Sequence, residues 1–291
     1  MIVDAHAHAW ERWPYEAGVP ATRGDVAALL HEMDAAGVDR ALVVCATVGG
    51  TDPATANPDN NTYVARAATA HPDRLDVLAD VDSRWTPTYH TPGAADRLER
   101  TVGLTDAVGV SHYLADDVDG WFSGAEGLEF LTRAADLGAL LSLHATPPWF
   151  GPLAAALREV PDLRVLLHHQ GHVTPGSPTY GTDLAALADL AQRPGVYVKV
   201  SGFHYLAAGR EAYPYPGTHG VLRALIGSFG SARLLWGSDF PVARRHLTYG
   251  QSLEILDHAG LRPAERADVL GRTAAHLLAG ARRHPTRVTA R

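Results

Sequence analysis

The chain has 291 residues, of which 46% are hydrophobic and 20% are charged, and this composition is typical of a folded globular protein. No apolar run reaches the roughly 18 residues that a membrane span requires, so a membrane protein is excluded. The net charge of −7 argues against nucleic acids and anionic membranes as partners, because both are bound through clustered positive charge.

Eight short apolar runs recur along the chain and are predicted as strands. The first begins at Met1 without the basic and apolar leader of a signal peptide, which predicts a cytoplasmic protein. The second contains Cys45, the only cysteine, which excludes an internal disulfide and is predicted to be buried. The predicted strands are residues 1–8, 40–46, 75–81, 107–113, 139–145, 164–170, 196–202 and 233–240.

Segments rich in Ala and Leu, with apolar residues at helical spacing, alternate with these strands. Asp25 and Asp183 lie near predicted helix starts, whereas Gly37 and Gly138 are predicted stops. Eight strand-helix units in strict alternation indicate an α/β fold, a (β/α)8 TIM barrel with a parallel sheet inside and helices outside. The predicted helices are residues 24–36, 57–70, 93–101, 125–137, 151–159, 182–192, 217–228 and 248–259.

After the eighth unit, residues 263–280 are predicted to form one more helix on the outside of the barrel. The basic segment 282–291 is predicted to be a flexible tail. There is no linker, low-complexity tract or solenoid repeat. We therefore expect a single domain over residues 1–281.

Side chains that can bind a metal occur at the ends of four predicted strands, where (β/α)8 barrels carry their chemistry. His6 and His8 are two residues apart on a strand, so their side chains share a face and can hold one ion. One His-x-His is a weak signal, but four strands that end in such residues make a shared site the better interpretation. The ends of strands one, five, six and eight carry His6 and His8, His144, His168 and His169, and Asp239.

These same segments resemble the amidohydrolase superfamily, in particular its amidohydrolase-related branch, also called amidohydrolase 2. The resemblance extends from residue 2 to about residue 280. The branch contains lactonases that act on sugar lactones and on pyrone-dicarboxylate-like intermediates of aromatic breakdown, and it also contains decarboxylases. The resemblance therefore implies the barrel fold and leaves the reaction open. The similar segments are VDAHAHAW, NPDNNTYVARAATAHPDRL, LSLHA, LLHHQGH and LLWGSDFP.

The resemblance implies that His6, His8, His144 and Asp239 hold a single divalent ion. Three imidazoles and one carboxylate suit Zn²⁺ first, with Mn²⁺ as an alternative. His169 matches a histidine that contacts water or the substrate carbonyl in the branch. Some lactonases of the branch work without a metal, so metal-independent catalysis stays open.

Two residues near this predicted site are harder to interpret. Many superfamily members use a carboxylated lysine on strand four to bridge two metals, but the only lysine here, Lys199, lies on predicted strand seven. A bridged two-metal site is therefore not expected, and Lys199 either points inward or packs along its strand. Strand alternation places His168 on the face opposite His169, which predicts a packed or supporting histidine.

The expected chemistry is hydrolysis of a lactone, or of a similar C–O or C–N bond, in a small ring-containing substrate. A bound ion lowers the pKa of water to about 7. Asp239 accepts the proton of that water and passes it to the leaving oxygen, and His169 polarises the carbonyl. The alternatives are nonoxidative decarboxylation of an aromatic or muconate-like acid at the same metal site, and a barrel that binds a small ligand without catalysis.

The loops after the strands offer candidates for a substrate pocket. Tryptophans there suit a ring-shaped substrate, or else cover the barrel mouth or a contact in a homodimer. Arginines after strand eight could pair with a substrate carboxylate or form a solvated surface pair. The candidates are Trp10, Trp85, His112, Tyr113, Trp149, His172, His204, Tyr205, Arg244 and Arg245.

Overall fold

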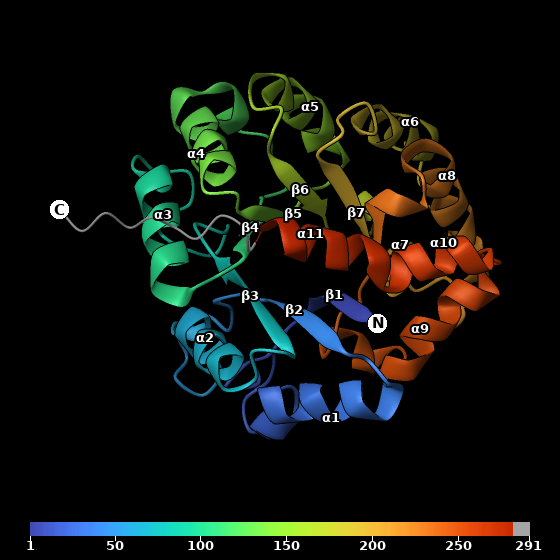
Figure 1. Ribbon diagram of the computed structural model, residues 1–291, viewed down its shortest axis with the longest axis horizontal. Coiled ribbons are helices and arrows are strands. Elements are labelled where there is room, and N and C mark those ends of the chain that lie inside the picture. Colours follow the sequence, from blue (N-terminus) through green and yellow to red (C-terminus); the bar gives the residue numbers. More distant parts are fainter. Residues whose placement is uncertain (282–291) are drawn as a thin grey trace.

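The computed structural model describes residues 1–281, so the predicted tail 282–291 lies outside the described residues. Eight parallel strands follow one another around the sheet in chain order, and helices surround them (Figure 1). A bridge between Ala7 and Phe240 brings the first strand beside the segment that follows the last. The predicted (β/α)8 barrel is therefore confirmed. The strands are β1 (Val3–Ala7), β2 (Arg40–Val44), β3 (Leu75–Asp80), β4 (Gly109–Tyr113), β5 (Leu140–His144), β6 (Arg164–Leu167), β7 (Val196–Val200) and β8 (Leu234–Trp236).

The eight predicted helices are present, with ends that differ by a few residues. Asp25 caps the first of them, because its side chain accepts a hydrogen bond from the Ala28 N–H, and Gly37 ends it with a left-handed backbone. One short helix after β7, α7 (Phe203–Ala207), was not predicted. The predicted helices correspond to α1 (Val26–Ala36), α2 (Asn60–Ala70), α3 (Ala94–Thr105), α4 (Ala125–Asp136), α5 (Phe150–Glu159), α6 (Tyr180–Leu190), α8 (His219–Phe229) and α9 (Tyr249–His258).

The predicted C-terminal helix is interrupted and lies elsewhere than expected. It comprises α10 (Pro263–Ala267), a π-helical turn over Asp268–Arg272 and α11 (Thr273–Ala281). Leu277 and Leu278 of α11 pack with strand residues that face the barrel interior, such as Leu42 and Leu166. The helix crosses the end of the barrel (Figure 1). It therefore closes the N-terminal end of the interior, and the expectation that it packs on the outside is wrong.

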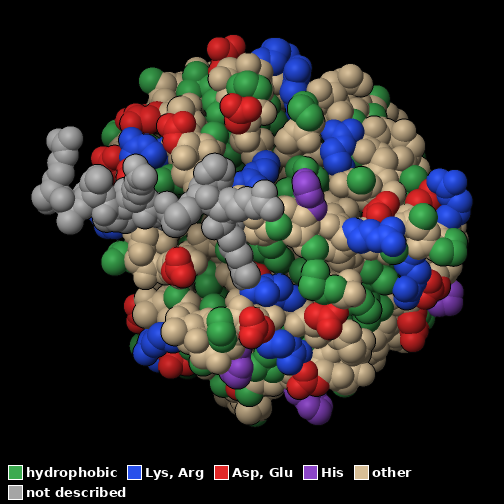
Figure 2. Space-filling view, viewed as in Figure 1, with side chains coloured by type: hydrophobic (Ala, Val, Ile, Leu, Met, Phe, Trp, Pro, Cys, Tyr) green, Lys and Arg blue, Asp and Glu red, His purple; other side chains and the backbone are tan. Residues whose placement is uncertain are grey.

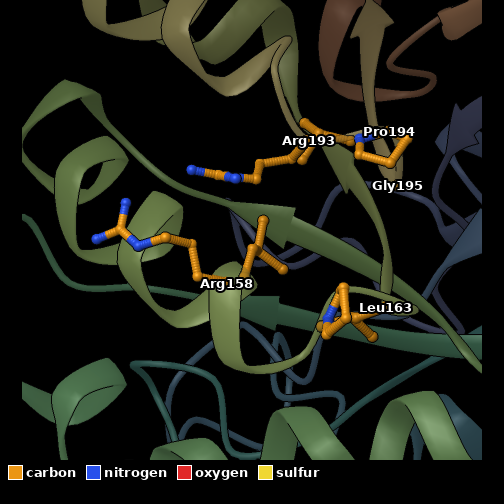
Figure 3. Close-up of a pocket in the computed structure, with 8 residues that line it drawn as sticks. Arg158, Leu163, Arg193, Pro194 and Gly195 are labelled. Atoms are coloured by element: carbon orange, nitrogen blue, oxygen red, sulfur yellow. The ribbon is translucent and has the colours of Figure 1, made fainter.

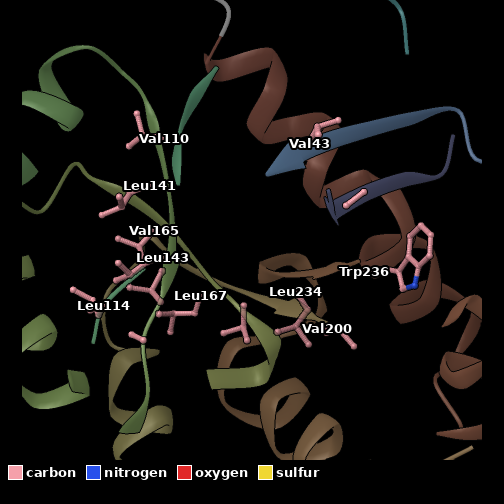
Figure 4. Packing of buried hydrophobic residues seen from close by; sticks show 14 of the residues in the cluster. Val43, Val110, Leu114, Leu141, Leu143, Val165, Leu167, Val200, Leu234 and Trp236 are labelled. Atoms are coloured by element: carbon pink, nitrogen blue, oxygen red, sulfur yellow. The ribbon is translucent and has the colours of Figure 1, made fainter. Parts of the chain in front are cut away.

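The main core lies between the outer faces of the strands and the surrounding helices. Figure 4 shows part of this layer, including Val110, Leu141, Leu167 and Trp236. Cys45 belongs to it and is fully buried, as predicted. Burial raises the pKa of the Cys45 thiol. Strand residues that alternate with this layer face the interior, where apolar side chains fill the N-terminal half and polar side chains the other half.

On the face shown in Figure 2, acidic and basic side chains are interspersed. Within residues 1–281, no helix is both long enough and apolar enough to cross a bilayer.

Candidate active site

Four histidines surround one aspartate at the C-terminal end of the barrel. The Nε2 atoms of His6, His8 and His169 lie 3.6, 3.7 and 3.9 Å from Oδ1 of Asp239. The Nε2 atom of His204, on α7, lies 3.6 Å from Oδ2 of the same carboxylate. All five side chains are buried. Residues more than 230 positions apart in the sequence therefore converge at one point. Strand ends one, six and eight of the predicted set contribute to it, whereas His204 follows strand seven, which that set did not include.

The backbone of β1 and of the segment after β8 sets this geometry. The register of β1 against β2 shifts between Asp4 and Ala7, and such a bulge re-aims side chains. The Asp239 N–H donates a hydrogen bond of 2.8 Å to the His6 carbonyl. Asp239 itself has a left-handed backbone, with φ of 56°, which is uncommon for a residue other than glycine. The carboxylate is thus turned toward the β1 histidines by main-chain contacts.

Gly237 allows this close approach of the two segments. A Cβ at this position would lie 2.5 Å from Cβ and 3.1 Å from the backbone nitrogen of His6. We expect Gly237→Ala to lower the free energy of unfolding by about 1–3 kcal/mol, because it overpacks a rigid contact. Urea unfolding measures this. Gly227→Ala is the matched control: nothing lies within 4 Å of its Cβ position on α8, so it should leave stability unchanged or raise it. Equal effects of the two substitutions would contradict the close-contact explanation.

Burial keeps the imidazoles of His6 and His8 neutral, the form that can bind a metal. His8 Nδ1 lies 2.7 Å from the Val44 carbonyl, so this nitrogen donates its hydrogen and leaves the lone pair on Nε2, which faces Asp239. Burial lowers the pKa of His8 to about 4 and that of His6 well below its usual range. Burial also raises the pKa of Asp239 to about 8, and a nearby cation would favour its charged form.

These residues fit a divalent cation. Three potential ligand atoms lie within 4.8 Å of one another in two groups of the described residues: His6 with His8 and Asp239, and His6 with His168 and His169. Buried polar atoms usually have a partner. His6 Nε2, His204 Nε2 and Asp239 Oδ2 are buried without a hydrogen-bond partner among residues 1–281. A cation bound between them would satisfy these atoms.

His144 belongs to neither group, so the predicted four-ligand set is present only in part. Its ring lies 5.1 Å from that of Tyr113 and 4.6 Å from that of His172, between ring centroids. Its Nδ1 atom is buried without a partner. His144 therefore lies beside the group of histidines around Asp239 and forms part of the wall of the adjoining cavity.

His168 does not lie on the face opposite His169, and that prediction is wrong. The rings of both residues lie 4.5 Å from that of His6, between centroids. His168 continues the alternation of Leu166 into the interior, and His169 then turns inward through a left-handed backbone with φ of 49°. Because the strand ends at Leu167, the period of two no longer applies to His169.

A cavity of about 330 Å³ opens above this cluster. Five of the predicted substrate-binding residues line it: Trp10, Trp85, Tyr113, His172 and Tyr205. His204 contacts Asp239 but does not line the cavity. Tyr15 and Arg84 line it and were not predicted. The complete lining is His8, Trp10, Tyr15, Ala46, Val48, Arg84, Trp85, Tyr113, His144, His169, His172, Tyr205, Asp239 and Val242.

Four predicted pocket residues lie elsewhere. His112 faces outward, where its Nδ1 is 2.9 Å from the Val81 carbonyl and its ring packs against Phe130. Trp149 is fully buried and donates a hydrogen bond from Nε1 to the Ala115 carbonyl. Arg244 forms an ion pair of 3.4 Å with Glu32, and Arg245 is exposed outside the cavity. The predictions for His112, Trp149 and Arg244 are wrong because strand phase and loop path decide which side chains face the cavity. The charge of Arg245 acts on Tyr15 of the cavity lining, so its role stays a prediction.

A second, smaller cavity lies at the opposite end of the barrel (Figure 3). It occupies about 150 Å³ beside the starts of β6 and β7, near Leu163 and Gly195. Arg158 and Arg193 extend along it, and no histidine or carboxylate lines it. In the part of the chain that the structure describes, this smaller cavity therefore offers neither an acid-base group nor a metal ligand for hydrolysis.

A family model described as Amidohydrolase matches residues 3–279, nearly the whole chain. The chain belongs to the amidohydrolase family. This amidohydrolase is 34% identical to the L-fucono-1,5-lactonase of Burkholderia ambifaria over 140 residues. That match covers 45% of this chain and 47% of the lactonase, so it spans about half the length of either.

Solved structures share the fold of this amidohydrolase. One is a putative 2-pyrone-4,6-dicarboxylic acid hydrolase from Pseudomonas putida, with a TM-score of 0.75, 23% identity, and coverage of 96% of this chain and 97% of that one. Another is an amidohydrolase from Burkholderia multivorans with bound zinc, with a TM-score of 0.74, 22% identity, and coverage of 96% and 99%.

The only lysine of this amidohydrolase points into the barrel beneath the histidines. Lys199 Nζ donates a hydrogen bond of 2.6 Å to Ser142 Oγ and lies 3.3 Å from His6 Nδ1. Ser142 Oγ is in turn 2.7 Å from His168 Nε2. The sequence left open whether Lys199 points inward or packs along its strand, and the structure shows that it points inward. Its ammonium group supports the ring of His6 from below.

Proposed function

We propose that this chain is a metal-dependent hydrolase that opens a lactone or similar cyclic ester. The observation that carries the proposal is the Asp239 carboxylate, with four imidazole Nε2 atoms 3.6–3.9 Å from its oxygens, at the floor of the 330 Å³ cavity. The similarity to an L-fucono-1,5-lactonase supports lactones as the substrate class.

His6, His8 and Asp239 would hold the ion, with His169 and His204 beside it. When bound there, a divalent ion such as Zn²⁺ supplies Lewis acidity that makes water more acidic. Asp239 then takes a proton from the water that attacks the acyl carbon, and it returns the proton to the ring oxygen as the C–O bond breaks. The water thus adds one hydroxyl to the carbonyl carbon and one proton to the leaving alkoxide.

The remaining residues orient the substrate. His169 is steadied by Ser201 Oγ, 2.9 Å from its Nδ1, and its Nε2 is directed toward the cluster, where it can stabilise the carbonyl oxygen as charge develops. Trp10, Trp85 and Tyr113 offer aromatic faces that hold a ring and exclude bulk water. The rings of His8 and Trp10 are stacked, with 5.0 Å between their centroids and an angle of 11° between their planes. This contact connects the aromatic wall of the cavity to His8, which would hold the ion.

The test combines metal analysis with a panel of lactones. We expect the purified protein to contain a divalent metal, and chelation to abolish lactone hydrolysis until Zn²⁺ or Mn²⁺ is restored. Mass spectrometry of the product distinguishes the reactions, because hydrolysis adds the mass of water and decarboxylation removes that of CO₂. Full activity of the metal-free protein would contradict the metal dependence. Loss of CO₂ would replace hydrolysis by decarboxylation.

A further inference from the structure

The geometry points to Arg84 as the residue that recognises the substrate, through a carboxylate that the lactone carries on the side of its ring away from Asp239. This inference rests on the proposed function and narrows its substrate class from lactones in general to anionic lactones. Three observations support the inference: the charges that line the cavity, the position of Arg84, and the weakness of its ion pair with Asp116.

The charges around the cavity are few. Among the described residues that line it, Arg84 is the one Lys or Arg and Asp239 the one carboxylate. Asp239 is buried at the floor, whereas the Arg84 side chain is 40% exposed and so lies toward the mouth. The walls between them are mostly aromatic and imidazole rings. A ring placed with its ester at Asp239 would therefore present its far substituent to Arg84.

The guanidinium of Arg84 is available for such a substituent. Its ion pair with Asp116 has an N–O distance of 3.7 Å, and the Asp116 side chain is 82% exposed. Exposed ion pairs of this kind contribute only about 0–1 kcal/mol, so a ligand carboxylate can replace Asp116 at small cost. An arginine can bind a carboxylate through two parallel hydrogen bonds, which would also orient the ring.

The main chain holds Arg84 in place. Its N–H donates a hydrogen bond of 2.9 Å to the Tyr113 carbonyl at the end of β4. On one side, Asp82 has a left-handed backbone and accepts hydrogen bonds of 2.9 Å from Arg97. On the other, Trp85 Nε1 donates to the buried carboxylate of Asp80. The position from which the guanidinium reaches the cavity is therefore fixed before a ligand binds.

The experiment compares one lactone ring bearing either a carboxylate or a carboxamide. We expect the native enzyme to prefer the carboxylate, and Arg84→Met to lower kcat/KM for it about 10- to 100-fold, the value of a charge-assisted hydrogen-bonded pair. For the carboxamide lactone, Arg84→Met should change kcat/KM less than about threefold. For the carboxylate lactone, Arg84→Lys should give a kcat/KM between those of the native enzyme and Arg84→Met. Arg223→Met, which removes an exposed arginine on α8 outside the cavity, is the matched control and should leave kcat/KM for both lactones unchanged.

Binding is measured separately from turnover, with a cyclic ether carboxylate that cannot be hydrolysed and its carboxamide as calorimetric probes. We expect the carboxylate probe to bind the native protein more tightly, and Arg84→Met to remove that preference while the melting temperature is kept. Equal losses for both probes, or no preference in the native protein, would overturn the assignment. If no lactone is turned over but the carboxylate preference depends on Arg84, the hydrolase proposal fails and the anion site stands.

Discussion

Asp239→Asn is expected to lower kcat/KM for the hydrolysed lactone by at least about 10³-fold. The asparagine keeps the shape of the side chain but cannot accept and return a proton, and positioned acid-base groups contribute about 10²- to 10⁴-fold. It also removes the negative charge that stands 3.6–3.9 Å from four imidazole nitrogens, so the affinity for a divalent cation should fall as well.

Steady-state kinetics and metal content together measure this effect. Asp257→Asn, the same change at a half-exposed carboxylate on α9 that pairs with Arg266, is the control and should leave both unchanged. If Asp239→Asn keeps its metal but loses activity, proton transfer is its main role. Activity within tenfold of the native enzyme would exclude Asp239 from the chemistry.

The second large effect is expected at Asp4, which joins β1 to the chain after β8. Its buried carboxylate accepts hydrogen bonds from the Ser238 N–H and hydroxyl, the Tyr249 hydroxyl and the His6 N–H, at 2.5–3.0 Å. Asp4→Ala leaves these donors without a partner in a site closed to water. Because an unsatisfied buried donor costs about 1–3 kcal/mol, we expect the free energy of unfolding to fall by about 3–5 kcal/mol.

Urea unfolding followed by circular dichroism measures the loss. Tyr249→Phe removes one donor and keeps the carboxylate, so it should cost only about 1 kcal/mol. A loss for Asp4→Ala no larger than for Tyr249→Phe would mean that the carboxylate does not hold the barrel closure together.

The barrel and the convergence of its polar strand ends were predictable because both follow from order along the chain. Strands that alternate with helices form a parallel barrel, and His6, His8 and Asp239 end the strands that close it. Which residues of a strand face the interior and which face the helices was not predictable. Both faces of a barrel strand are buried, so nothing in the run AVGVSHY shows that Tyr113 faces the cavity and His112 the helices.

Other differences come from the ends of strands and from loops. The left-handed backbone at His169 turns its ring inward and cannot be read from the local sequence. Loop paths bury Trp149 and carry Arg244 to Glu32 on α1. Arg84, by contrast, lies four residues after the end of β3, and the reasoning that proposed the arginines after strand eight would have found it if it had been applied to the loop after strand three.

The α11 helix has a consequence for how the enzyme cycles. Leu277 and Leu278 close one end of the barrel with apolar contacts, and the layer of Lys199 and Ser142 fills the interior between this seal and the histidines. Within residues 1–281, the reaction chamber therefore opens on a single side. The product has to leave through the same opening by which the next substrate enters, so product and substrate exclude each other.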